Sequence, residues 1–342
     1  MKITIILGVK DTSGGGESLH QLCAQLQKKY DCGIFYYDSI DYKCPDKFKK
    51  YNIQVLEKIR DDNDSIVIVP DIYTGYLANI KFSQKIIWWL SYDFYEMSLP
   101  KNKAKKFLEK YKLPNAFSSL VLFLAKMFKV IPTFMFNEIN FKKDSEIEHI
   151  YNCEYLKAKL KRMGIKEEKM SYLCAPISDT FYKSNNTKKQ NLVAYNPSKG
   201  KQFTDKLIKA CNNYYPNIDF VPIIDMTEKE VYNCLSSCKL YIDFGEFPGP
   251  ERIPRQAVMC RCNIITSLEG AAENQYDVPI PNDFKIERKE SNIVKICNKI
   301  NKSLINYEKE LYKFDLYRKK VLAQKNNFSS DILSIFDKIG GK

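Results

Sequence analysis

The chain has 342 residues, with 54 Lys and Arg against 41 Asp and Glu, which gives a formal net charge of +13. Hydrophobic residues make up 44% and charged residues 28%, a globular composition that excludes a wholly disordered chain. At this length we expect two domains rather than one core. The positive charge comes mainly from lysine, and a solvated basic surface is its simplest interpretation, so the net charge names no partner.

The first residues and the cysteines favour a cytoplasmic protein. Residues 1–8 form an apolar run too short for a secretion signal, and we interpret them as a first strand. Eleven cysteines include no C-x-x-C pair, and the chain has only two histidines, so no zinc site is indicated. We expect reduced and mostly buried thiols, and no metal.

Short apolar runs alternate with segments of helical period along the first half. The strands are expected at 3–7, 33–37, 66–69, 86–90, 149–152 and 170–174. The helices are expected at 18–29, after a Gly-rich loop, and at 154–163. This alternation is typical of an α/β sheet with right-handed crossovers.

The segment 117–136 is apolar and nearly long enough to span a membrane. Lys126, Lys129 and Pro132 interrupt it, which makes a membrane span improbable. Two interpretations stay open: a core helix followed by a strand, or an interfacial helix whose lysines reach anionic headgroups. The lysine run 101–106 would help the second electrostatically, although it fits a solvated loop equally well.

The polar stretch 183–191 is the best linker candidate, and the alternation restarts beyond it. Strands are expected at 191–195, 218–224, 240–244 and 262–266, and helices at 203–212, 228–237 and 255–259. From about residue 291 the chain is charged and helical, without strands. The sequence therefore predicts two α/β halves followed by a helical tail.

Three loop motifs follow predicted strands, where α/β sheets bind ligands. The first is Gly14-Gly15-Gly16, which either approaches a ligand or simply connects strand and helix. The second is Asn196-Pro197-Ser198-Lys199-Gly200-Lys201, whose lysines either face an anion or lie on a solvated turn.

The third motif is the most specific. It joins a Gly/Pro-rich loop to Glu251, Arg252 and Arg255, and Pro254 is expected to begin the next helix as its first residue. Arginine's rigid fork suits diphosphate oxygens, and a neighbouring carboxylate can hold both hydroxyls of a ribose. An Arg–Glu cluster that only braces the loop is the structural alternative. Gly270 and Ala271 offer a further small-residue turn after the next strand.

With these motifs the sequence resembles bacterial glycosyltransferases of the GT-B architecture, of the type that assembles capsule and lipopolysaccharide. The residues that carry the resemblance are Gly14-Gly15-Gly16-x₃-His20, Tyr195-Asn196-Pro197-x-Lys199-Gly200, Asp243-Phe244-Gly245-x₂-Pro248-Gly249-x-Glu251-Arg252-x-Pro254-Arg255, Gly270-Ala271-Ala272 and Asp277-x-Pro279-Ile280-Pro281. The resemblance implies two Rossmann-like domains that face each other across a cleft. It places an acceptor domain at 1–186, a nucleotide-sugar domain at 187–290, and helices at 291–342 that return to the first domain.

The resemblance also implies site residues and a metal-independent reaction, without a cofactor beyond the nucleotide sugar. The residues expected to bind the donor are Gly15, Gly16, Asn196, Lys199, Gly245, Gly249, Glu251, Arg252, Arg255, Gly270 and Ala271. Cationic side chains and helix N-termini would neutralise the departing diphosphate. Many retaining GT-B enzymes carry two glutamates seven residues apart, whereas Glu246 and Glu251 are closer here, so retention and inversion both stay open.

An inverting enzyme needs a general base near the acceptor hydroxyl. The candidates are Asp93, His20 and Glu17, and Asp93 ranks first because it lies just beyond the apolar run 86–90. Each of the three is structural in the simpler interpretation, and His20 in particular fits a packed position in a helix.

The expected function is the transfer of a sugar from a nucleotide diphosphate to a glycan or lipid-linked acceptor in surface polysaccharide synthesis. The protein would work in the cytoplasm, free or docked on the inner face of the membrane through 101–136. A basic nucleic-acid-binding protein is one alternative, but no known binding motif supports it. Another Rossmann-type enzyme is a second alternative, and the missing G-x-G-x-x-G pattern tells against it.

Overall fold

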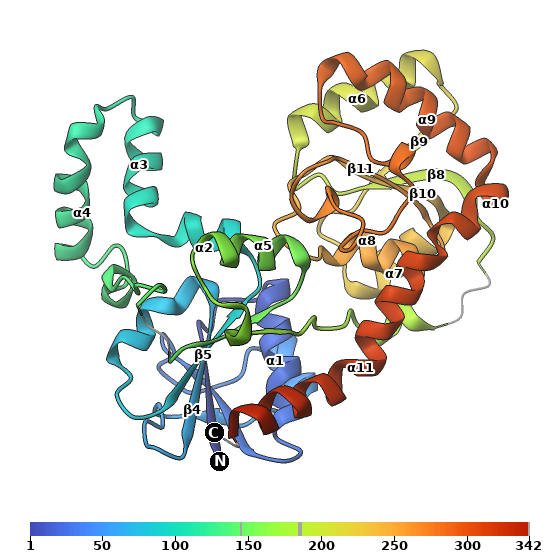
Figure 1. Cartoon of the computed structure of the whole chain (residues 1–342). Coiled ribbons are helices and arrows are strands. Elements are labelled where there is room, and N and C mark those ends of the chain that lie inside the picture. The colour runs from blue at the N-terminus through green and yellow to red at the C-terminus, as the bar shows by residue number, and fades with distance from the viewer. Residues whose placement is uncertain (144–145, 184–186, 341–342) are drawn as a thin grey trace. The chain divides into compact units, whose positions relative to one another are not determined.

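The computed structural model describes residues 1–143, 146–183 and 187–340 (Figure 1). Its contacts divide the chain into two compact units. The first contains Met1–Asn152, Leu156–Ala175 and the chain from Ser329 onward, and the second contains Cys153–Tyr155 and Pro176–Phe328. The expected linker at 183–191 includes residues 184–186, which lie outside the described residues. The division into an acceptor and a donor domain stays a prediction.

The first unit is built on a parallel sheet with the strand order β3-β2-β1-β4-β5-β6-β7. Its strands are β1 (Lys2–Leu7), β2 (Asp31–Tyr36), β3 (Val55–Leu56), β4 (Ser65–Pro70), β5 (Gln84–Trp89), β6 (Glu148–Tyr151) and β7 (Met170–Tyr172). Unbroken apolar runs suit parallel strands because helices cover both faces. In β5 the last four residues are fully buried, as the run 86–90 predicted.

The helices of this part of the chain follow the strands in alternation. They are α1 (Gly14–Leu26), α2 (Tyr92–Ser98), α3 (Pro100–Lys110), α4 (Ser118–Met127) and α5 (Glu154–Arg162). Helix α1 begins four residues earlier than predicted, because Ser13 caps it and the three glycines form its first turn rather than a loop. The short 3₁₀ helices are η1 (Asp46–Tyr51), η2 (Asp71–Asn79), η3 (Asn115–Phe117), η4 (Thr133–Phe136) and η5 (Glu167–Lys169), and η6 (Asp179–Tyr182) follows in the second unit.

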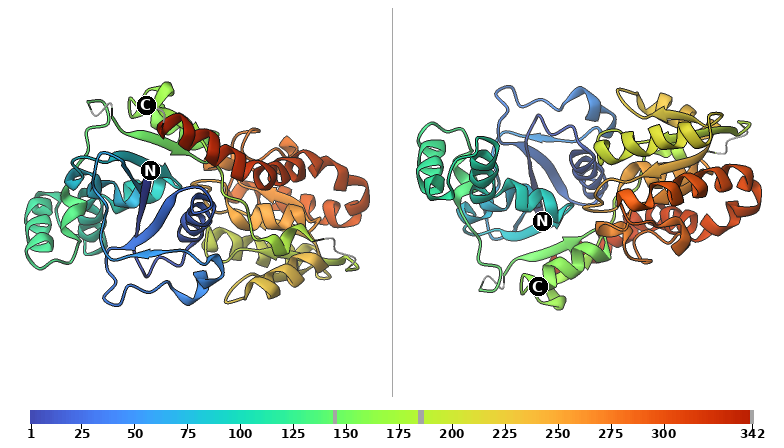
Figure 2. Two further views of the ribbon diagram at one scale, coloured as in Figure 1. Left: turned by 90° about the horizontal axis from the view of Figure 1, so that it is seen from below. Right: turned by 90° about the horizontal axis from the view of Figure 1, so that it is seen from above.

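The structure of the segment between β5 and β6 contradicts the interpretation as a core helix followed by a strand. Helices α3 and α4 stand side by side as a hairpin that projects from the sheet of the first unit, as all views show (Figures 1 and 2). The lysine run 101–106 belongs to α3, so the solvated-loop interpretation is wrong. The expected core helix and strand are wrong as well: none of the ten residues of α4, each described by the structure, is buried, and η4 replaces the strand.

The second unit is built on a smaller parallel sheet with the order β11-β10-β8-β9. Its strands are β8 (Gln190–Tyr195), β9 (Asp219–Pro222), β10 (Cys238–Asp243) and β11 (Asn263–Thr266). The helices between them are α6 (Lys201–Tyr214), α7 (Glu228–Ser237) and α8 (Arg252–Met259). Helix α8 begins at Arg252, so Pro254 is its third residue and the prediction that Pro254 comes first is wrong.

The remaining elements are helical, as expected for the tail. They are η7 (Gly270–Ala272), η8 (Asn282–Phe284), η9 (Glu290–Asn292), α9 (Ile293–Ile305), α10 (Tyr307–Glu310), η10 (Leu311–Phe314) and α11 (Asp315–Gly340). The last turns of α11 pack in the first unit, where Asp337 Oδ1 accepts hydrogen bonds from Lys29 Nζ at 2.7 Å and Tyr30 Oη at 2.6 Å. The predicted return of the C-terminal helices to the first domain is therefore confirmed.

No helix that the structure describes has both the length and the apolar character needed to cross a membrane.

Candidate functional site

Three loops leave the second sheet at the same edge. Because the strands are parallel and Asp243 pairs with Thr266 while Ile242 pairs with Tyr195, β8, β10 and β11 end side by side. The loops are 196–200, 244–251 and 267–272, and they contain every donor-binding residue predicted in this unit except those in α8. This is the edge at which α/β sheets hold ligands.

Gly200 lets the first two loops pack backbone against backbone. It has φ +61° and precedes α6, and a Cβ added there would lie 2.3 Å from the carbonyl oxygen of Phe244. A side chain would therefore clash with the backbone and strain the left-handed conformation. The close approach fixes the position of Lys199, the residue before it, beside the loop that follows β10.

Asp243 organises the loop after β10 from inside the sheet. It is 3% exposed, and its carboxylate accepts hydrogen bonds from Tyr241 Oη at 2.7 Å and from the Gly245 amide at 2.9 Å. Burial raises the pKa of Asp243 to about 6, and these hydrogen bonds limit the rise. The buried position of Asp243 makes it a support of the loop.

Lys199 and Glu251 form the central pair of the site. Lys199 Nζ lies 2.8 Å from Glu251 Oε2, and their side chains are 24% and 21% exposed. Glu251 is the N-cap residue of α8, and Arg252 is the first residue of that helix and is half-buried. The second and third motifs therefore supply a partly exposed cation and carboxylate in direct contact, an arrangement suited to a ligand with both phosphate and hydroxyl groups.

Arg288 is a member of the site that the sequence analysis missed. It donates to the Phe244 carbonyl oxygen at 3.2 Å and forms ion pairs with Glu246 at 3.1 Å and Glu269 at 2.8 Å. It thus links the loops after β10 and β11. Arg288 also lines a cavity of about 480 Å³ at the beginning of α6. The other lining residues are Gly200, Lys201, Gln202, Phe203, Lys206 and Glu290.

The remaining predicted donor-binding residues of this unit differ in how far they are buried. The Ala271 amide donates to the Phe247 carbonyl oxygen at 2.8 Å, so the Gly270-Ala271 turn packs on the loop after β10. Gly249, in the same loop, is buried. Asn196 accepts from the Ser198 amide at 3.0 Å and shapes its own loop. Arg255 is 4% exposed and donates to Gln324 Oε1 at 3.2 Å, which joins α8 to α11.

His20 and Glu17, two candidates for the general base, lie in packed positions of the first unit. His20 is 0% exposed, and because its Nδ1 lies 2.6 Å from the Gly16 carbonyl oxygen, Nδ1 donates and Nε2 accepts from Tyr36 Oη at 2.6 Å. Burial lowers the pKa of His20, which keeps the ring neutral. Glu17 is 8% exposed and accepts hydrogen bonds from Tyr51 Oη and Lys50 Nζ.

Asp93 lies in a more accessible position, in the first turn of α2. It is half-buried, and Ser91 caps the helix by accepting from the Phe94 amide at 3.2 Å. The helix start is held by Asp71, which is 3% exposed and accepts from the Leu90 and Ser91 amides. Burial raises the pKa of Asp71 to about 7. Asp71 was not among the residues predicted for the site, although it directly follows the apolar run of β4.

Gly15 and Gly16 belong to the first turn of α1, where both amides donate to Ser13 Oγ, at 3.1 and 3.3 Å. A Cβ on Gly16 would lie 2.2 Å from the Asp11 carbonyl oxygen, whereas one on Gly15 would meet its neighbours at ordinary distances. The packing around α1 therefore requires glycine at position 16, whereas position 15 has room for a Cβ.

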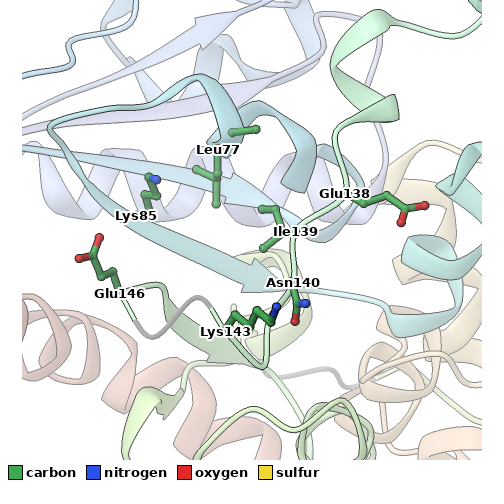
Figure 3. A pocket seen from close by; sticks show the side chains of 8 residues that line it. Leu77, Lys85, Glu138, Ile139, Asn140, Lys143 and Glu146 are labelled. Carbon is green, nitrogen blue, oxygen red and sulfur yellow. The ribbon is translucent and has the colours of Figure 1, made fainter.

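A further cavity of the first unit has a volume of about 470 Å³ (Figure 3). Lys85 lies in its wall and is the second residue of β5, so the cavity lies toward the amino end of that strand. Glu138, Asn140 and Lys143 line its other side. Ligands of parallel sheets bind at the opposite, carboxyl edge, so we do not assign the site to this cavity.

The chain matches known proteins in fold but not in sequence. No family model and no curated protein sequence matches the chain. Solved structures do match over the full length. HepE from Anabaena in complex with UDP has a TM-score of 0.60 at 11% identity, with 100% of both chains covered. A glycosyltransferase from Rickettsia africae has a TM-score of 0.57 at 13% identity, covering 99% of this chain and 97% of its own.

WaaG, a glycosyltransferase involved in lipopolysaccharide biosynthesis, has a TM-score of 0.53 at 10% identity, covering 99% of this chain and 98% of its own. The chain has the GT-B fold. The fold class predicted from the sequence is therefore confirmed. Within the second unit of this GT-B fold, the charged residues gathered at the carboxyl edge of the sheet include Lys199, Glu251, Arg252 and Arg288.

Proposed function

We propose that the chain is a glycosyltransferase that takes its sugar from a nucleoside diphosphate. The observation that carries this proposal is the ion pair of Lys199 and Glu251 at the carboxyl edge of the second sheet, where Arg288 links the loops that follow β10 and β11. The GT-B fold supports it. HepE, which shares the fold, has been crystallised with UDP and with UDP-glucose, so UDP is the first nucleotide to test.

The site residues have separate roles in this proposal. Lys199 and Arg252 would hold the diphosphate, whose negative charge grows when its bond to the sugar breaks. Glu251 would accept hydrogen bonds from the ribose hydroxyls once the diphosphate draws Lys199 away from it. Arg288 would keep the loops after β10 and β11 in place. The cationic groups thus stabilise the leaving group, and the predicted independence from metal stays a prediction.

The acceptor hydroxyl must lose a proton when its oxygen bonds to the sugar carbon. Asp93 is our first candidate for the base, because it is half-buried in the first turn of α2, whereas His20 and Glu17 are packed. A base must reach the reacting hydroxyl through a hydrogen bond. Asp71 would act on this step indirectly, because it positions the backbone that leads into α2.

We further propose a glycan or lipid-linked acceptor in surface polysaccharide synthesis. WaaG, which shares the fold, works in lipopolysaccharide biosynthesis and supports this choice. A reducing compartment agrees with the cysteines: all eleven lie among the described residues and have free thiols. We therefore propose that the reaction takes place in the cytoplasm.

Calorimetric titration with UDP, GDP and ADP tests the proposed function. We expect one of the three to bind, and we expect Lys199→Met to weaken its binding at least about tenfold, because a charge-assisted contact to the diphosphate is lost. Lys209→Met is the matched control, since Lys209 is an exposed lysine in the middle of α6. The control should bind like the wild type.

The result that contradicts the proposal is an absence of binding with all three nucleotides, or equal affinities in both variants. The alternative of a nucleic-acid-binding protein predicts instead a salt-dependent gel shift with arbitrary duplex DNA. We expect no such shift at concentrations at which the nucleotide saturates the protein.

A further inference from the structure

Helix α4 lacks the buried face that helices of globular proteins have. A surface helix normally turns an apolar stripe toward the core and exposes its polar face. Helix α4 has the sequence SSLVLFLAKM, in which seven of the ten residues are apolar and the other three are two serines and a lysine. The structure describes all ten residues, and none of them is buried. Its main packing partners are α3 and η3, which belong to the same projecting hairpin (Figure 1).

Exposed apolar side chains recur along the hairpin from residue 107 to residue 130. Phe123 is 62% exposed, Phe128 68% and Val130 75%. The other exposed apolar and aromatic side chains of the hairpin are Phe107, Tyr111, Leu113, Phe117, Leu120, Leu124 and Met127. Exposed patches of this kind on a folded protein mark a surface that binds something apolar.

The charge of the same segment limits what that partner is. Residues 100–136 contain eight lysines, one glutamate and no other charged residue, so the segment carries a net charge of +7. Lys105, Lys106, Lys110, Lys126 and Lys129 are exposed. The glutamate, Glu109, lies 3.9 Å from Lys105 and neutralises little of this charge. The partner must therefore combine an apolar interior with a negative surface.

We propose that the α3–α4 hairpin docks on an anionic lipid bilayer. With its 10 residues, α4 is about 15 Å long, half the hydrocarbon thickness of a bilayer, so it lies in the interface and does not cross it. Its aromatic and aliphatic side chains enter the region below the headgroups, and the lysines of α3 contact the anionic headgroups. A second copy of the chain is a poorer partner, because the two hairpin segments, each with a net charge of +7, would repel each other.

Vesicle flotation of the full-length protein tests this inference. In 50 mM salt we expect the wild type to float with phosphatidylcholine vesicles that contain 30% phosphatidylglycerol, and to stay in the bottom fraction with pure phosphatidylcholine. Raising the salt to 500 mM should reduce the bound fraction, because it screens the lysines. Equal recovery with both kinds of vesicle, or no flotation with either, would overturn the proposal.

A matched pair of variants locates the docking surface. Phe123 in α4 and Phe82 in the loop before β5 are both 62% exposed, so Phe123→Asp and Phe82→Asp add a charge at equally exposed positions. We expect Phe123→Asp to lower the bound fraction at least about tenfold and Phe82→Asp to float like the wild type. Equal flotation of the two variants, or the conversion of a wild-type dimer to a monomer by Phe123→Asp, would contradict membrane docking.

A fluorescence readout avoids any dependence on a disruptive variant. The chain has two tryptophans, Trp88 and Trp89, and both are 0% exposed. Phe123→Trp therefore places a tryptophan where bilayer contact would occur, and we expect brominated lipids to quench it while Phe82→Trp stays unquenched. Quenching of neither would overturn the proposal. Both experiments need no nucleotide, so their failure leaves the proposed glycosyltransferase function untouched.

Discussion

Two adjacent glycines, Gly15 and Gly16, show how narrowly single residues are constrained. Both lie in the first turn of α1 and donate to Ser13. A Cβ added to Gly16 would lie 2.2 Å from the Asp11 carbonyl oxygen, while a Cβ added to Gly15 would come no closer than 3.4 Å to the Leu90 side chain. The pair of alanine substitutions therefore separates helix propensity from steric clash.

We expect Gly16→Ala to lower the free energy of unfolding by about 1–3 kcal/mol, because the backbone must move to relieve the clash. Gly15→Ala should be neutral or raise it by about 0.5 kcal/mol, because alanine favours the helix. Urea unfolding followed by circular dichroism measures both. Equal changes in the two variants would show that the contact with Asp11 does not constrain the turn.

At the scale of elements, one lysine holds the C-terminal ends of two helices. Lys189, beside the start of β8, donates to the carbonyl oxygens of Leu235 at 2.9 Å and Cys238 at 2.7 Å, at the end of α7. It donates as well to Cys260 O at 2.6 Å, at the C-cap of α8. A cation in this position satisfies carbonyls that lack helical partners and interacts favourably with both helix dipoles.

Replacing Lys189 should therefore destabilise α8, the helix that begins with Arg252 of the candidate site. We expect Lys189→Met to lower the free energy of unfolding by about 2–4 kcal/mol, since several charge-assisted hydrogen bonds are lost and their carbonyls stay covered. Lys188→Met is the control, because Lys188 is an exposed neighbour. Chemical denaturation compares the two, and a loss below about 0.5 kcal/mol in Lys189→Met would contradict the capping role.

At the scale of the whole molecule, the order of elements was predictable because its signals are local. The buried runs of β1, β4 and β5 were predicted within two residues, and α7 was predicted with its observed bounds. Helix α7 has a capping box between Thr227 and Glu230, which fixes its start within a few residues of sequence. These features do not depend on distant parts of the chain.

The errors arose where a local signal was ambiguous or absent. Helix α3 was missed because its lysines suggested a solvated loop, although Pro100 at its first position was an available start signal. Strand β3 has only two residues and carries no pattern. Arg288 joined the site through contacts with residues 19 to 44 positions away, Glu269, Glu246 and Phe244, which no spacing in the sequence announces.

In the proposed function, a nucleoside diphosphate binds the three loops at the carboxyl edge of the second sheet. Hydrogen–deuterium exchange of the full chain with and without saturating UDP tests it most directly, because it reads every loop at once. We predict slower amide exchange in 196–201, 244–252 and 267–272, and unchanged exchange in the exposed α3–α4 hairpin. Protection confined to other segments, or no protection at a UDP concentration that calorimetry shows to be saturating, would contradict the account.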